Sequence, residues 1–199
     1  MSKEFWNERY AQNLSVYGIE PNVFFKEQLQ SIKPGKLLLP AEGEGRNALY
    51  AASIGWNVTA FDYSEVAKAK TLERAASLGI ATITYNISDL SLIELPQEEF
   101  DAVALIYVHL PVDIRKQLNK QCIQSLKKGG TLILEAFSKD QLYYASGGPK
   151  DTALLYSLDV LTEDFSGMKI VQIQEVVTTL HEGAFHEGPA SVVRMLVVK

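Results

Sequence analysis

A short glycine-containing segment offers the clearest chemistry in this sequence. In LLLPAEGEGRNA, Gly43 and Gly45 directly follow an apolar run, and Arg46, Asn47 and Ala48 then open a helical pattern. The spacing reads as G-x-G-x-x-A, in which glycines let the backbone turn tightly and approach a ligand at a helix N-terminus. A strand-to-helix turn that binds nothing would share this pattern, so the segment needs support from other residues.

Two carboxylates lie where such a ligand would need them. Asp62 ends a second apolar run, 19 positions after Gly43, where an acidic residue can accept hydrogen bonds from both hydroxyls of a ribose. Asp89, in NISDL, follows a third run and is placed to accept an adenine amino group. Either residue alone would more often be a turn or helix-capping aspartate. Together with the glycine segment, the two aspartates lie at three successive strand ends, and this joint position favours a bound ligand.

Charge distinguishes two cofactors that both contain a ribose and an adenine. NAD brings a dianionic pyrophosphate to such a turn, whereas S-adenosylmethionine (SAM) brings an ammonium and a sulfonium. Glu42 and Glu44 flank Gly43, and two carboxylates would repel a pyrophosphate and attract a cation. They could equally serve only the dipole of the following helix. None of the nine tyrosines has a lysine four residues later, which argues against an NAD-dependent oxidoreductase.

The elements that must position these residues alternate along the chain. Strands are expected at residues 36–41, 57–62, 81–86, 100–107 and 131–137. Helical patterns separate them, which is typical of parallel strands joined by crossover helices. One helical stripe comprises Val66, Ala69, Leu72 and Ala76, and another comprises Ile114, Leu118, Cys122 and Leu126. Pro111 and Gly129-Gly130 should mark the ends of the second helix, in which Cys122 would be a packing residue.

The last third of the sequence breaks this alternation. A short helical stretch at 158–165 precedes two apolar runs, at 169–180 and 191–198. Ten residues between the runs are too few for a helical crossover, so the two runs should pair antiparallel. We therefore expect an α/β fold: a Rossmann-like, seven-stranded mixed sheet with helices on both faces and the last strand antiparallel.

Composition narrows the classes of partner. A chain of 199 residues with 47% hydrophobic residues can bury one core but is too short for two, so we expect a single domain over residues 1–199. A net charge of −5 lacks the basic excess that binds nucleic-acid phosphates. With no apolar run of membrane-spanning length, no signal-peptide pattern and one cysteine, we expect a cytoplasmic protein without nucleic-acid or membrane partners, as a monomer or weak homodimer.

A family resemblance covers roughly residues 5–140. Five segments resemble, in order and spacing, the SAM-binding motifs of class I SAM-dependent methyltransferases: LLLPAEGEGRNALYAA, VTAFDYS, NISDL, FDAVALIYVHLP and KKGGTLILEAF. The resemblance is greatest to the tellurite-resistance-type subfamily, whose loop also carries Gly-x-Gly-Arg-Asn. Two positions depart from the family pattern: Leu39 replaces the usual acid of the first strand, and Ala41 replaces the first glycine of the loop.

The resemblance implies SAM as the cofactor. It places the amino-acid part between Gly43 and Gly45, the ribose at Asp62, the adenine at Asp89, and Tyr107 beneath the cofactor. The full set of expected cofactor contacts is Ala41, Glu42, Gly43, Gly45, Arg46, Asn47, Asp62, Tyr63, Asp89, Leu90 and Tyr107. Residues 1–30, in which Trp6 and Tyr10 share a helical face, resemble the family's lid, although a helix packed on the sheet would look alike.

All three histidines fall in expected loops. His109 follows the fourth strand, and His181 and His186 belong to a doubled His-Glu-Gly at 181–183 and 186–188. Because ligands in open α/β sheets bind beyond the carboxyl ends of the parallel strands, we expect all three near the methyl group as catalytic residues that accept a proton or orient an oxyanion. Histidines five apart between two strands do not match the zinc-protease helix, so no metal is expected.

The expected activity is methyl transfer to a small-molecule acceptor, namely a thiol, a hydroxyl compound or a metalloid oxyanion. After the fourth strand the sequence reads IYVHLP, without the Asn/Asp-Pro-Pro-Tyr/Phe motif of nucleobase methyltransferases. Two alternatives stay open at this point: an NAD-dependent oxidoreductase and a non-catalytic SAM-binding module.

Overall fold

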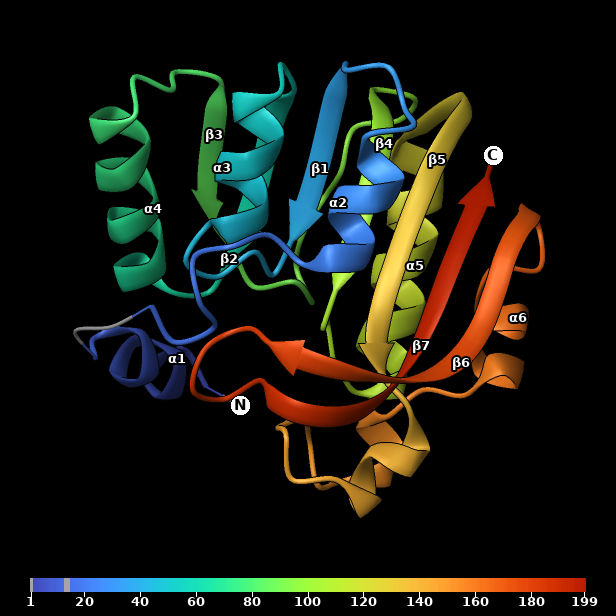
Figure 1. Cartoon of the computed structure of the whole chain (residues 1–199). Coiled ribbons are helices and arrows are strands. Elements are labelled where there is room, and N and C mark those ends of the chain that lie inside the picture. Colours follow the sequence, from blue (N-terminus) through green and yellow to red (C-terminus); the bar gives the residue numbers. More distant parts are fainter. Residues whose placement is uncertain (1, 13–14) are drawn as a thin grey trace.

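Seven strands form one sheet in the order β3-β2-β1-β4-β5-β7-β6 in the computed structural model, which describes residues 2–12 and 15–199 (Figure 1). The strands are β1 (Lys36–Pro40), β2 (Asn57–Asp62), β3 (Ile83–Ile87), β4 (Phe100–Ile106), β5 (Leu126–Phe137), β6 (Lys169–His181) and β7 (Glu187–Val198). Strands β1 to β5 pair in parallel, and β7 runs antiparallel to both β5 and β6. The expected mixed sheet with an antiparallel last strand is confirmed.

Helices cover both faces of the sheet. They are α1 (Lys3–Tyr10), α2 (Val23–Leu29), α3 (Arg46–Ser53), α4 (Glu65–Ser77), α5 (Val112–Ser125) and α6 (Leu158–Asp164), with two short 3₁₀ helices, η1 (Lys139–Tyr143) and η2 (Thr152–Leu154). Alternate residues of β1 separate two core layers: Leu37 and Leu39 face α2 and α3, whereas Leu38 faces α5 and α6. The stripe predicted for α5 is confirmed at Leu118 and Cys122, which are fully buried, and at half-buried Ile114, whereas Leu126 belongs to β5.

Two strands end at backbone turns that no glycine in the sequence marks. Strand β1 stops at Pro40 and β4 at Ile106, because Ala41 and Tyr107 adopt left-handed φ angles of 54° and 55°. The predicted helix end at Gly129-Gly130 is wrong. Helix α5 ends at Ser125, and the backbone of Leu126 already pairs with β4 while its side chain enters the core.

The apolar stripe predicted for α4 is also wrong. The helix buries Ala67, Thr71 and Ala75, whereas Ala69, Leu72 and Ala76 are exposed. Small residues face inward because α4 approaches the start of α3 closely: a Cβ added to Gly45 would lie 2.2 Å from Thr71 Cγ2. Close backbone packing therefore overrides side-chain hydropathy on this helix.

The carboxyl ends of the parallel strands meet α1 and the β6–β7 hairpin at one edge of the sheet (Figure 1). Residues 182–186 connect the two hairpin strands, so the turn is tighter than the ten-residue connection expected from the sequence. Within the described residues, no helix has the length and apolar character needed to cross a membrane.

Candidate functional site

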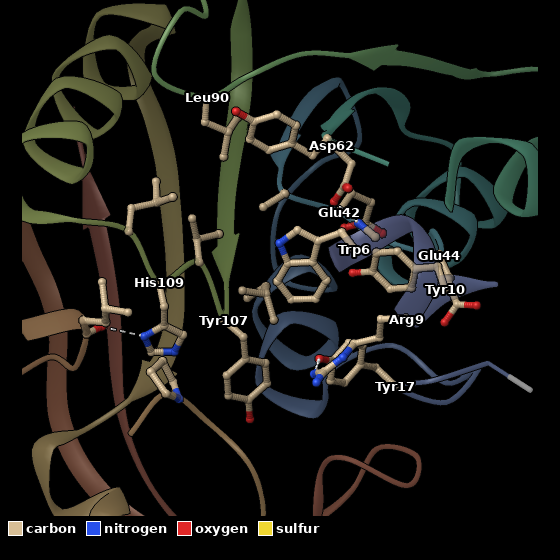
Figure 2. Close-up of a pocket in the computed structure, with 18 of the residues that line it drawn as sticks. Trp6, Arg9, Tyr10, Tyr17, Glu42, Glu44, Asp62, Leu90, Tyr107 and His109 are labelled. Atoms are coloured by element: carbon tan, nitrogen blue, oxygen red, sulfur yellow. Dashed lines mark hydrogen bonds between the residues drawn. The ribbon is translucent and has the colours of Figure 1, made fainter. Parts of the chain in front are cut away.

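A cavity of about 500 Å³ opens at this edge, lined by the loops that follow β1 to β4, by α1 and by the hairpin turn. It brings together all but two of the predicted site residues: Ala41, Glu42, Gly43, Arg46, Asn47, Asp62, Tyr63, Asp89, Leu90, Tyr107, His109 and His186. In Figure 2, Asp62 and Glu42 lie toward one end and Tyr107 and His109 toward the other, with Trp6 between them. The cavity thus joins the predicted cofactor and acceptor residues.

Three left-handed residues at alternate positions turn the chain from β1 into α3. Ala41, Gly43 and Gly45 have φ angles of 54°, 64° and 78°. A non-glycine residue in this conformation is strained by about 1–2 kcal/mol, so Ala41 keeps the turn of the usual glycine at some cost. Gly45 does not line the cavity. Its lack of a side chain serves the contact with Thr71, and its expected role as a cofactor contact stays a prediction.

Glu42 and Asp62 are buried carboxylates that stabilise this loop. The Glu42 Oε1 atom accepts a hydrogen bond of 2.7 Å from the Ala48 amide at the start of α3, and burial raises the pKa of Glu42 to about 7. Asp62 accepts 2.9 Å hydrogen bonds from the amides of Gly43 and Ser64, and burial raises its pKa as well. Each carboxylate keeps further lone pairs for a ligand.

Asp89 lies in the loop that follows β3 and lines the cavity. It accepts hydrogen bonds from the Tyr63 hydroxyl, from the Ser91 amide at 2.8 Å and from the Ser91 hydroxyl at 2.7 Å. The Tyr63 hydrogen bond is the largest cause of a lowered pKa for Asp89. Asp89 is therefore ionised at neutral pH, beside the buried side chain of Leu90.

Glu44 differs from Glu42 in what it binds. Its carboxylate accepts from the Val16 amide at 2.7 Å and forms a 2.8 Å ion pair with Lys70. Glu44 lines the cavity, and the expectation that it attracts a cationic ligand stays a prediction. Its charge is balanced by Lys70, and it anchors the segment that follows α1.

Helix α1 forms one wall of the cavity. The Trp6 and Tyr10 rings stack at 5.5 Å, as their spacing predicted, and a Cβ on Gly43 would lie 2.7 Å from the Tyr10 hydroxyl. The Arg9 guanidinium lies 4.6 Å from the Phe185 ring centre and so connects α1 to the hairpin. By contrast, α2 packs in the core against the sheet, so among the described residues of 1–30 those that line the cavity precede α2.

His186 is the predicted histidine that the hairpin turns inward. The side chain is buried, and its Nδ1 lies 3.4 Å from Glu182 Oε2. Rings of Tyr17, Tyr107 and Phe137 pack around the imidazole at centroid distances of 4.6, 4.5 and 5.1 Å. Burial lowers the pKa of His186, and the Glu182 hydrogen bond opposes that effect.

The other two histidines differ from the expectation. His109 lines the cavity, but its Nδ1 lies 2.8 Å from the Leu154 carbonyl and its Nε2 accepts from the Phe137 amide at 3.3 Å; burial lowers its pKa to about 4. Both nitrogens are thus engaged in holding loops together. The placement of His181 near the methyl group is wrong, because its side chain is 74% exposed and pairs with Glu187. Alternation along β6 turns His181 outward.

A buried polar network beneath the cavity was missed by sequence reasoning. Glu135 accepts hydrogen bonds from Asn22 Nδ2 at 2.6 Å, the Tyr107 hydroxyl at 3.0 Å and Arg194 Nε at 2.5 Å. Glu135 and Arg194 face each other in the β5–β7 register. The signal was present: each is a lone charged residue within an apolar strand, in TLILEAF and VVRMLVV. In the part of the chain that the structure describes, no group of three His, Cys, Asp or Glu residues could hold a metal.

Comparison with known proteins agrees with this geometry. A family model described as a methyltransferase domain matches residues 38–134. A curated protein from Haemophilus influenzae (strain 10810), "Probable S-adenosyl-L-methionine-dependent methyltransferase TehB", is 25% identical over 156 residues, which are 76% of this chain and 52% of that protein. The chain therefore spans about half the length of that relative.

Solved structures share the fold. The crystal structure of TehB from Haemophilus influenzae superposes with a TM-score of 0.73 at 19% identity, covering 99% of this chain and 66% of the other. A structure described as "Conversion of a Disulfide Bond into a Thioacetal Group during Echinomycin Biosynthesis" gives a TM-score of 0.74 at 20% identity, covering 99% and 92%. By these matches the chain is similar to the class I SAM-dependent methyltransferases, and to the TehB-type proteins among them.

Proposed function

We propose that this protein transfers the methyl group of SAM to a small-molecule acceptor, namely a thiol, a hydroxyl compound or a metalloid oxyanion. One observation carries the proposal: a single cavity joins the acids of the cofactor loops to an aromatic wall that contains His186. A volume of about 500 Å³ is within the range of small-molecule sites.

The residues of the loop fit SAM better than NAD. A helix N-terminus is the place where a pyrophosphate would bind, but at α3 the Ala48 amide already donates to Glu42. A second anion there would meet like charge, whereas a cationic ligand would be attracted by ionised Glu42. Asp62 would hold the ribose hydroxyls and Asp89 the adenine amino group, as the family resemblance implies.

Bound SAM supplies an electrophilic methyl group on a good leaving group, and the chain must place the acceptor, exclude water and take up a proton. Helix α1 covers the cofactor loop through Tyr10 and serves as the lid. Neutral His186, with its Nδ1–H directed at Glu182, takes the acceptor proton on Nε2. His109 supports the same wall without exchanging protons, because both of its nitrogens are engaged.

Calorimetric titration with SAM, S-adenosylhomocysteine (SAH), NAD and NADP tests the cofactor. We expect micromolar-range binding of SAM or SAH and no measurable binding of NAD. Tight NAD binding without SAM binding would overturn the proposal. A screen of thiols, hydroxyl compounds and metalloid oxyanions with methyl-labelled SAM then identifies the acceptor class.

Once an acceptor is known, two histidine variants test the proton step. His186→Ala should lower turnover by about two orders of magnitude, the loss expected for a general base, and leave SAM affinity within about twofold. His181→Ala should change neither quantity, because that side chain faces solvent. Equal activity of both variants would remove His186 from the reaction.

A further inference from the structure

Glu182 occupies a junction that the methyltransferase fold does not explain. Its Oε2 atom lies 2.9 Å from Arg46 Nη2 and 3.4 Å from His186 Nδ1, while Oε1 accepts from Asn22 Nδ2 at 3.0 Å. Arg46 begins α3 directly after the cofactor loop, His186 comes from the hairpin turn, and both line the cavity. One buried carboxylate therefore contacts the residue that follows the cofactor loop, the acceptor wall and the residue that caps the start of α2.

Charge dictates how the protons are arranged at this junction. Arginine stays protonated in proteins, and its ion pair stabilises the ionised carboxylate. Burial acts to raise the pKa of Glu182, but hydrogen bonds with His186 and Arg46 and the Arg46 charge hold it below its usual range. An ionised carboxylate can only accept, so Nδ1 of neutral His186 must carry the proton. The lone pair is left on Nε2.

Close backbone contacts fix the hairpin turn in this position. A Cβ on Gly183 would lie 2.4 Å from the Gly18 amide nitrogen, and one on Gly147 would lie 2.2 Å from the Phe185 carbonyl oxygen. All three glycines have left-handed φ angles, between 74° and 111°. The turn is thus held between two other segments with no room for side chains, and Glu182 has little freedom to leave the junction.

We propose that Glu182 is a positioning residue for methyl transfer: it fixes the tautomer of His186 and joins that residue to the cofactor loop through Arg46. This inference rests on the proposed function. Glu182 touches neither reactant in this role; it acts through the two side chains that do.

The hairpin provides a matched control. His181 and Glu187 form the same kind of pair, with Nδ1 and Oε1 2.8 Å apart, but their side chains are 74% and 58% exposed. Because both pairs flank the same turn and use the same residue types, Glu187→Gln makes the same chemical change outside the cavity.

The decisive measurement is ¹⁵N and ¹³C NMR of the histidine rings in the SAH-bound protein. In the wild type, His186 should carry its proton on Nδ1. Glu182→Gln should lower the pKa of His186, because the lost charge favoured the imidazolium, and should reduce turnover at least tenfold. The other groups near this imidazole, Arg46, Arg9, His109, Tyr17 and Tyr107, are unchanged in that variant. Glu187→Gln should shift only His181.

The outcomes separate this inference from the proposed function. Failure of the wild type to bind SAH refutes the methyltransferase proposal itself. Binding of SAH with an Nε2–H tautomer at His186 refutes the positioning role, and this measurement needs no variant. If Glu182→Gln does not fold, Glu182→Asp is the second variant, which retains the charge on a shorter side chain. Unchanged kcat in Glu182→Asp would also overturn the inference. Lowered kcat with near-normal SAH affinity would support it.

Discussion

Replacing Asp62 with alanine should affect both the ligand and the loop that binds it. The side chain is buried and accepts hydrogen bonds from two backbone amides, those of Gly43 and Ser64, each at 2.9 Å. Sequence reasoning assigned Asp62 only to the ribose. The structure adds that the same carboxylate holds the glycine turn against the end of β2, so Asp62→Ala should not leave the fold at full stability.

The magnitude follows from these two hydrogen bonds. A hydrogen bond to a charged acceptor contributes about 1.5–3 kcal/mol, which gives roughly 3–6 kcal/mol for two. Burial of the ionised carboxylate offsets part of that gain, as its raised pKa indicates. We therefore expect the free energy of unfolding to fall by about 2–4 kcal/mol. Loss of the ribose contacts should weaken SAH binding at least tenfold, or about 1.4 kcal/mol.

Urea denaturation and calorimetric titration with SAH, below the midpoint of the variant, measure the two effects. Asp101→Ala is the matched control: Asp101 also accepts from a backbone amide, that of Lys36 at 2.8 Å, but at the amino end of β1 and away from the cavity. It should lose stability and keep its affinity for SAH. Affinity within twofold of wild type in folded Asp62→Ala would refute the reasoning and leave Asp62 a turn residue.

Three further predictions concern the loop and the core. SAM affinity should rise as pH increases through about 7, because Glu42 then ionises beside the cation. Folding stability should change in the opposite direction: because the pKa of Glu42 is raised, the contribution of this group to stability is present below about pH 4.5 and is lost as the pH rises to about 7. In titrations and thermal melts at a series of pH values, Glu42→Gln should remove both dependences. Gly43→Ala should weaken SAH binding and stability for two reasons, namely the positive φ of this residue and the contact of a Cβ with the Tyr10 hydroxyl. In a double-mutant cycle, Tyr10→Phe should recover only the loss that comes from the contact. Full recovery would show that φ strain is negligible. Buried Cys122, whose pKa burial raises to about 12, should react with thiol reagents only on unfolding, so rapid labelling of the native protein would contradict its place in the core.

The fold was largely predictable because its signals are local. Apolar runs, a glycine turn and helical spacing are properties of neighbouring residues. They predicted where the strands lie and which of them run parallel or antiparallel. The errors arose where tertiary contact overrides local pattern. The stripe of α4 follows the close approach of Gly45 and Thr71 rather than hydropathy, and α5 gives way to β5 at Leu126 because that side chain belongs to the core.

The candidate site also has one half that local sequence predicts and one half that depends on tertiary contacts. Its cofactor half lies in loops that directly follow strands, so topology alone brings residues such as Asp62 and Asp89 together. The acceptor half depends on which way a hairpin turn faces. His181 and His186 have the same sequence context, His-Glu-Gly, yet one faces solvent and the other faces the cavity. Alternation along β6 turns His181 outward, whereas the inward position of His186 depends on Glu182, Arg46 and the glycine contacts of the turn, which no local pattern in the sequence reveals.

The contact between Gly18 and Gly183 joins residues 165 positions apart, whereas the cofactor residues from Ala41 to Leu90 span fewer than fifty. The entropy of closing a loop grows with its length. Closing the contact between Gly18 and Gly183 therefore costs more chain entropy than bringing together the loops from Ala41 to Leu90, and the wall that contains His186 exists only where the two outer parts of the chain have met.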